Sequence, residues 1–169
     1  MNDKYEDGFS CKIWAPDSFK MINIQDISIR VRIYNHITSE RFRPNPHVLY
    51  KKSEGFFIVC DITNRSSIEN AKYYYDNIKF YANDDARIIL LLNKCDKNEN
   101  REKNNEEIKE MAGELGINYF ETSAKTGQNV QDVFYLLIED IIKNNEIFNN
   151  LKIKLEKDDK KVKNNKCNK

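Results

Sequence analysis

Two unbroken apolar runs, 55–62 (GFFIVCDI) and 87–93 (RIILLLN), constrain the fold of this chain more than any other feature. Neither run alternates apolar with polar residues, and such runs are typical of strands that helices cover on both faces. Apolar residues at helical spacing follow each run, over 66–82 and over 105–115. Strands that alternate with helices of this length form right-handed crossovers. The sequence therefore predicts an α/β domain with a mostly parallel sheet.

Two shorter β-branched runs, 19–24 and 27–34, precede these elements and are separated by only two residues. The second run alternates apolar with polar residues, so the pair predicts a half-exposed antiparallel hairpin at the edge of the sheet. The stretch 36–55 is polar and contains two prolines, which predicts a loop or a distorted helix.

Local signals set the limits of the remaining elements. Ser66, with Glu69 three residues later, predicts a capping box at the start of the helix over 66–82. Gly116 predicts the end of the helix that precedes it, 117–121 predicts another strand, and a last helix begins near Asn129.

The bulk composition suits one globular domain with charged ends. The 169 residues are 40% hydrophobic and carry a net charge of +1, which gives no reason to expect binding to nucleic acid. No apolar run approaches the ~20 residues that span a membrane, and the first residues do not resemble a signal peptide. We expect a divergent N-terminal segment over 1–18, a domain over 19–143, and a charged, largely disordered tail over 144–169.

The cysteines and histidines predict no metal site. The four cysteines lie far apart and form no CxxC pair, which argues against a disulfide framework or structural zinc and favours a reducing, cytoplasmic setting.

The motif NKCD follows the strand 87–93, at the edge of a parallel sheet where ligands bind. Asp96 is a candidate to accept two hydrogen bonds from adjacent N–H and NH₂ groups on one edge of a flat ring. Guanine offers that pair and adenine does not. We expect the methylene stem of Lys94 to cover the ring and the amide of Asn93 to tie neighbouring loops together.

The motif ETSAK follows the next strand, so it should face the same ligand. Its Ser123 lies 27 positions after Asp96, the backbone N–H of Ala124 could meet the guanine carbonyl, and Lys125 could cover the other ring face. NKxD alone is a weak pattern, but the two motifs after successive strands form a specific one. In the alternative interpretation, both lysines are solvated and the aspartate only forms a turn.

These motifs resemble those of the Ras-like small GTPases, most closely the Rab branch, over roughly 17–143. DITNRSS is similar to the family's strand-to-helix turn, ERFR to a Rab-type stretch, and LGINYFETSAKTGQNVQDVF is similar over its length. The resemblance implies the P-loop NTPase fold, GTP or GDP as ligand, and a role in vesicle trafficking. It also implies protein effectors or regulators that bind through 19–53, and a cytoplasmic location, peripheral on the cytosolic face of intracellular membranes.

The sequence departs from the family in its phosphate-binding parts. It contains no GxxxxGK[ST] motif, so the first strand, P-loop and first helix are missing or replaced, and Mg²⁺ is doubtful. The run 9–14 could replace the first strand, and a truncated gene model is an equally simple explanation. Where the family has WDTAGQE, this chain has YNHITSE, with Asn35, Thr38 and Ser39 at three key positions.

These departures predict weak guanine-nucleotide binding with impaired hydrolysis, and they leave enzyme activity uncertain. The alternative is a nucleotide-independent pseudoGTPase, an interaction module that uses the hairpin and 36–53. An unrelated flavodoxin-like enzyme would need a catalytic constellation that the sequence does not offer. Cys167 is the candidate for lipidation, but its setting matches neither a CaaX nor a paired-cysteine ending, so an unmodified tail is the alternative.

Overall fold

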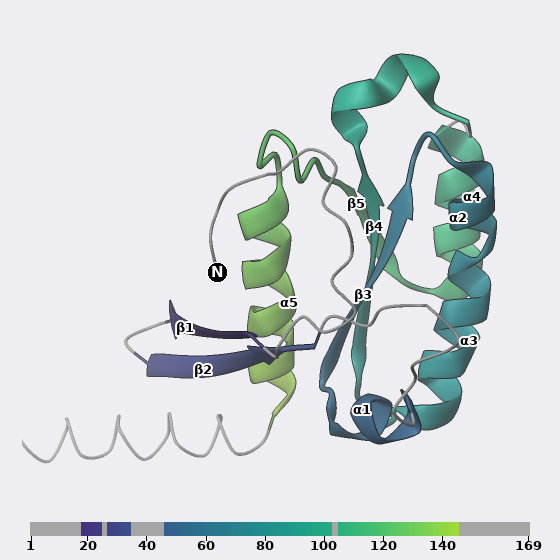
Figure 1. Ribbon diagram of the computed structural model, residues 1–169. Helices are drawn as coiled ribbons and strands as arrows, with labels where there is room; N and C mark the ends of the chain where they lie inside the picture. Colours follow the sequence, from purple (N-terminus) through teal and green to yellow (C-terminus); the bar gives the residue numbers. More distant parts are fainter. Residues whose placement is uncertain (1–17, 25–26, 35–45, 103–104, 146–169) are drawn as a thin grey trace, which may run out of the picture.

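A three-stranded parallel sheet lies between helices in the computed structural model, which describes residues 18–24, 27–34, 46–102 and 105–145 (Figure 1). The strands are β3 (Gly55–Asp61), β4 (Arg87–Asn93) and β5 (Asn118–Glu121), in the order β3-β4-β5. The register pairs Asp61 with Asn93 and Leu92 with Glu121, so the three strands end at one rim of the sheet. The predicted α/β class and parallel pairing are confirmed.

Side chains on the two faces of β4 enter two separate clusters of the core. Leu90 and Leu92 are fully buried against one set of helices, whereas Ile89 and Leu91 pack against the C-terminal helix. The prediction of a strand covered on both faces is therefore correct for β4. For β3 it holds at Phe57, which packs against the C-terminal helix, but not at Val59, which is 60% exposed.

Five α-helices accompany the sheet in the described part of the chain. They are α1 (Pro46–Lys52), α2 (Arg65–Glu69), α3 (Ala71–Tyr81), α4 (Asn105–Leu115) and α5 (Val130–Asn144). In Figure 1, α2, α3 and α4 lie on one side of the sheet and α5 on the other. The predicted inward stripe over 66–82 is confirmed, since Ile68, Ala71 and Ile78 are buried.

The start of this helical region differs from the predicted capping box. The cap is Asn64, whose side chain accepts a hydrogen bond from the Ser67 N–H, while Glu69 forms an ion pair with Arg65 at 2.9 Å. The region is also divided at Asn70, so 66–82 is two helices rather than one. Ser66 lies inside α2, one residue after its start, so it cannot serve as the N-cap that a capping box requires.

The ends of the last two helices agree with the sequence signals. Gly116 follows α4 with φ +65°, a left-handed conformation that glycine adopts at little cost. Asn129 precedes α5, which buries Val133, Leu137 and Ile138. α1 falls inside the stretch that the prolines predicted to be loop or distorted helix.

The predicted hairpin is present as β1 (Ser18–Ile24) and β2 (Ile27–Ile33), paired antiparallel. Within the described residues it forms a two-stranded sheet of its own and not the edge of the parallel sheet. One face is mostly apolar and includes the buried Ile22, while Phe19 and Met21 on the other face are 47% and 60% exposed.

Several predictions lie outside the described residues. They concern the run 9–14, Asn35, Thr38 and Ser39, the tail beyond 145 and Cys167.

Candidate functional site

The two predicted loops meet at the rim where the parallel strands end. The hydroxyl of Ser123 donates to Oδ1 of Asp96 at 2.6 Å, and the N–H of Ala124 donates to Oδ1 of Asn93 at 3.0 Å. A backbone hydrogen bond of 3.1 Å from Cys95 to Thr122 joins the same loops. The expectation that one rim holds both motifs is therefore confirmed by direct contacts.

Asp96 presents an ionised carboxylate to solvent at this rim. It lies in the first turn of a 3-10 segment, Cys95–Asn100, and is exposed, whereas Ser123 is fully buried. The hydrogen bond from Ser123, helped by a backbone N–H and the nearby charges of Lys125 and Lys97, outweighs desolvation and lowers the pKa of Asp96. An ionised carboxylate is an acceptor only, as recognition of paired ring N–H donors requires.

Ala124 and Asn93 are already joined to one another. The Ala124 N–H, which the sequence assigned to a guanine carbonyl, is used by the Asn93 side chain in this structure. A ring carbonyl would therefore share this N–H in a three-centre hydrogen bond or take the place of Asn93. The expected role of Asn93 in tying the two loops together agrees with this contact.

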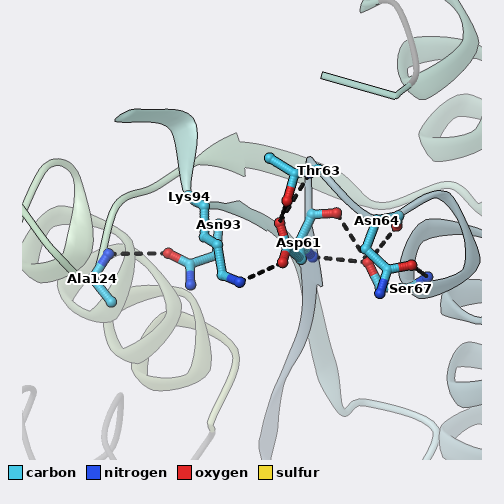
Figure 2. Close-up of polar contacts among 7 residues, drawn as sticks. All are labelled: Asp61, Thr63, Asn64, Ser67, Asn93, Lys94 and Ala124. Carbon is cyan, nitrogen blue, oxygen red and sulfur yellow. Dashed lines mark hydrogen bonds and ion pairs between the residues drawn. The ribbon is translucent and has the colours of Figure 1, made fainter. Parts of the chain in front are cut away.

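Lys94 points away from Ala124 and contacts Asp61, a residue that the sequence reasoning did not select (Figure 2). Its Nζ lies 2.5 Å from Oδ2 of Asp61, and its backbone is left-handed, with φ 68° and ψ 33°. Asp61 ends β3, directly beside Asn93 at the end of β4. An acid at the end of a neighbouring parallel strand was the signal available in the sequence.

The carboxylate of Asp61 is fixed on its other oxygen as well. Oδ1 accepts hydrogen bonds from the Thr63 N–H at 2.9 Å and from Thr63 Oγ1 at 2.7 Å. Desolvation alone would raise the pKa of Asp61, but the hydrogen bonds from Lys94 and Thr63 and the charge of Lys94 together lower it. Asp61 is therefore a partly buried, ionised partner for the lysine ammonium.

The backbone of Asp61 is held by the first helical turn that follows it. Its N–H donates to Ser67 Oγ at 2.9 Å, and the same Oγ lies 3.0 Å from the Asp61 carbonyl and 2.8 Å from that of Asn64. Figure 2 shows these contacts beside the Lys94–Asp61 pair. The end of β3 and the start of α2 thus form one hydrogen-bonded corner.

A second ion pair, which the sequence analysis did not predict, joins the segment after NKCD to the first residue of ETSAK. Arg101 Nη2 lies 2.5 Å from Oε1 of Glu121, the first residue of ETSAK, and Arg101 Nε donates to Asn98 at 2.8 Å. The Arg101 side chain is 13% exposed. Asn129 donates to the Glu121 carbonyl at 2.8 Å and so connects the start of α5 to the same point.

Within the described ranges, no three His, Cys, Asp or Glu side chains gather as a metal-binding group. The expectation about Mg²⁺ stays a prediction. A hollow of about 460 Å³ exists at the opposite end of the strands, beside Arg87 and Asp140, and none of the six predicted site residues lines it.

None of the helices in the described part of the chain has the length and apolarity needed to cross a membrane.

Comparisons with known proteins agree with the motifs. A family model described as the Ras family matches residues 1–143. The chain is 33% identical over 140 residues to the human Ras-related protein Rab-8B, an alignment that covers 83% of this chain and 68% of that protein. It is 35% identical over 133 residues to the GTP-binding protein YPTM1 of Zea mays, covering 79% of this chain and 64% of that protein. It is 31% identical over 137 residues to the Ras-related protein SEC4 of Candida albicans, covering 81% and 65%. The chain thus spans about two thirds of the length of these relatives.

Proposed function

This chain is a Rab-like member of the Ras family, and from that premise we propose that its rim site binds the base of a guanine nucleotide. The observation that carries the proposal is the Ser123–Asp96 hydrogen bond, which holds an ionised carboxylate toward solvent between the two motif loops. A guanine ring can donate its N–H and NH₂ groups to Asp96, while the stems of Lys94 and Lys125 cover its faces.

The proposed affinity is weak. Charge-assisted hydrogen bonds contribute roughly 1.5–3 kcal/mol each, so two bonds from Asp96 and some ring contact come near the ~4 kcal/mol of a millimolar complex. In relatives that have the GxxxxGK[ST] loop, contacts to the phosphates and Mg²⁺ supply much of the binding free energy for the nucleotide. The 169 residues of this chain contain no such motif. Guanosine and GTP should therefore bind with similar strength.

Hydrolysis is proposed to be impaired for the same reason. Asn35, Thr38 and Ser39 stand where the family has its aspartate, phosphate-contacting glycine and water-positioning glutamine. Without these groups the charge that develops on the phosphates lacks its usual stabilisers. The Rab resemblance supports a role in vesicle trafficking on the cytosolic face of membranes, with effectors that contact 19–53.

A nucleotide-independent interaction module is the second candidate. The observation that favours it is the exposed face of the hairpin, where Phe19 and Met21 lie in solvent and the Arg30 guanidinium carbon stands 4.0 Å from the centre of the Phe19 ring. Such a face offers an aromatic and cationic surface to a protein partner.

Thermal-shift and calorimetric titrations with guanosine and with GTP, each with and without Mg²⁺, separate the two candidates. We expect millimolar binding of both ligands by the unchanged protein, little effect of Mg²⁺, and no response to adenosine. Asp96→Ala should abolish the response, whereas Asp76→Ala, which removes an exposed acid on α3, should leave it intact. No response to any guanine ligand would favour the interaction module. Nanomolar, Mg²⁺-dependent GTP binding would contradict the weak affinity.

A further inference from the structure

We propose that Asp61 is a positioning residue for the base site, which holds Lys94 in place so that the lysine stem can lie against a bound guanine ring. The inference rests on the proposed function, because it names the residue through which part of that base affinity is achieved. Asp61 itself would not touch the ligand.

The first support is the path of the Lys94 side chain. The register places Asp61 beside Asn93, one residue before Lys94, and the left-handed backbone of Lys94 accompanies a side chain that reaches across to β3. Figure 2 shows Asn93 and Lys94 pointing in opposite directions along the rim, toward Ala124 and Asp61 respectively. The lysine stem therefore lies along the same rim as the contacts that join the two motif loops.

The second support is the rigidity of the anchor. Asp61 Oδ1 accepts two hydrogen bonds from Thr63, and its backbone N–H is bound by Ser67 Oγ, which leaves Oδ2 directed at Lys94 Nζ. A free lysine side chain has several rotatable bonds to immobilise when a ligand binds. When the ammonium group is already held by Asp61, part of this conformational entropy is lost before the ligand binds. Such preorganisation favours affinity.

The third support comes from exposure. The Lys94 side chain is 47% exposed although its charge is paired, whereas the Asp61 side chain is 22% exposed. The carboxylate is thus the more buried partner, and about half of the lysine side chain remains accessible to a ligand. A partly exposed ion pair contributes only modestly to folding, so a role in the site helps to account for the left-handed backbone of Lys94.

A double-mutant cycle on the full chain tests the proposal, with guanosine as the calorimetric probe. Asp61→Asn should weaken guanosine binding about fivefold, the size expected for loss of a partly exposed ion pair that orders a contact side chain. Lys94→Met should weaken binding as well, and Asp61→Asn should add nothing in that background. A purely structural Asp61 would instead weaken binding by the same factor in both backgrounds. Glu69→Gln, which removes the exposed Arg65–Glu69 pair, is the control and should leave the Kd unchanged.

The possible failures are distinct. If the unchanged protein binds neither guanosine nor GTP, the proposed function fails and this inference fails with it. If the unchanged protein binds guanosine and Asp61→Asn binds it equally well, only the positioning role is overturned. If Asp61→Asn does not fold, Thr63→Val takes its place because it removes the 2.7 Å hydrogen bond to Oδ1. It should weaken binding about twofold, and only when Lys94 is present; equal Kd values with and without Thr63 Oγ1 would overturn the proposal.

Discussion

Ser123 and Asp96 lie 27 positions apart in the chain, yet the Ser123 hydroxyl donates a 2.6 Å hydrogen bond to the Asp96 carboxylate. Ser123 has no exposed surface, so this hydrogen bond links the exposed carboxylate of Asp96 to a buried side chain of the domain. The same hydroxyl oxygen accepts the Thr126 N–H at 3.1 Å. One buried side chain therefore orients the acid and shapes the loop that faces it.

Ser123→Ala should raise the pKa of Asp96 toward its ordinary value, because the Ser123 hydrogen bond is the largest cause of the lowered pKa. It should also lower the free energy of unfolding by about 1–2 kcal/mol, since the buried Ser123 hydroxyl is removed and the Thr126 N–H loses its acceptor. Carboxyl NMR titration and urea unfolding measure the two effects. Ser53→Ala, which removes a 2.8 Å hydrogen bond to Leu49 away from the rim, should leave the Asp96 titration unchanged. An unaltered Asp96 pKa in Ser123→Ala would contradict this assignment.

The stability that Asp61 contributes should depend on pH in one direction. Its folded-state pKa lies below the ordinary value of 3.8, so the contribution is complete above that value and is lost as the pH falls through the folded pKa. The difference in unfolding free energy between the unchanged protein and Asp61→Asn should be about 1 kcal/mol and constant at neutral pH, and it should shrink below about pH 4. Urea unfolding across this range is the measurement. A difference that grows on acidification would show that the sign is wrong.

Glu121→Gln should destabilise the domain by about 1–3 kcal/mol, because it removes the Glu121 carboxylate from its ion pair with the largely buried Arg101 guanidinium. Glu139→Gln is the matched control. It breaks a 3.4 Å pair with Lys143 on the exposed face of α5 and should cost less than about 0.5 kcal/mol. Chemical unfolding of the two variants compares them directly, and equal losses would contradict a supporting role for Arg101.

Two glycine substitutions should have opposite effects on thermal stability. A Cβ at Gly55 would lie 2.7 Å from Ile141 Cδ1 and 3.1 Å from Leu137 Cγ, so Gly55→Ala should destabilise the β3–α5 contact by about 1 kcal/mol. A Cβ at Gly113, inside α4, meets nothing within 4 Å, so Gly113→Ala should stabilise the domain by about 0.5–1 kcal/mol. Calorimetric melting measures both. A gain in stability for Gly55→Ala would show that α5 packs more loosely on β3 than the structure indicates.

Strong local patterns explain which parts of the fold were predictable. The boundaries of β4 and α4 agree with the apolar run over 87–93 and with the helical spacing before Gly116. The choice of cap before α2 was not predictable, because Asn64 and Ser66 are both good cap residues. The observed cap at Asn64 accompanies the hydrogen bonds between the Ser67 hydroxyl and the Asp61 backbone. Those bonds exist only once β3 and α2 meet.

The residues of the candidate base site were also accessible from the sequence, because NKCD and ETSAK each follow a strand and parallel strands end at one rim. Asp61 was missed as a partner of Lys94, and Glu121 as a partner of Arg101. Each pair joins residues on separate elements, and only the lateral order of the strands brings them into reach.

The amino-acid sequence by itself determined the class of the fold, the limits of its strongest strand and helix, and the two motifs that we propose face a ligand. These properties depend on side-chain chemistry and spacing along a single segment. Only the tertiary structure decided that the hairpin forms a separate sheet, that Val59 is exposed, and that Asp61 holds Lys94. Each of these depends on which elements lie side by side, and that is set by packing the whole domain.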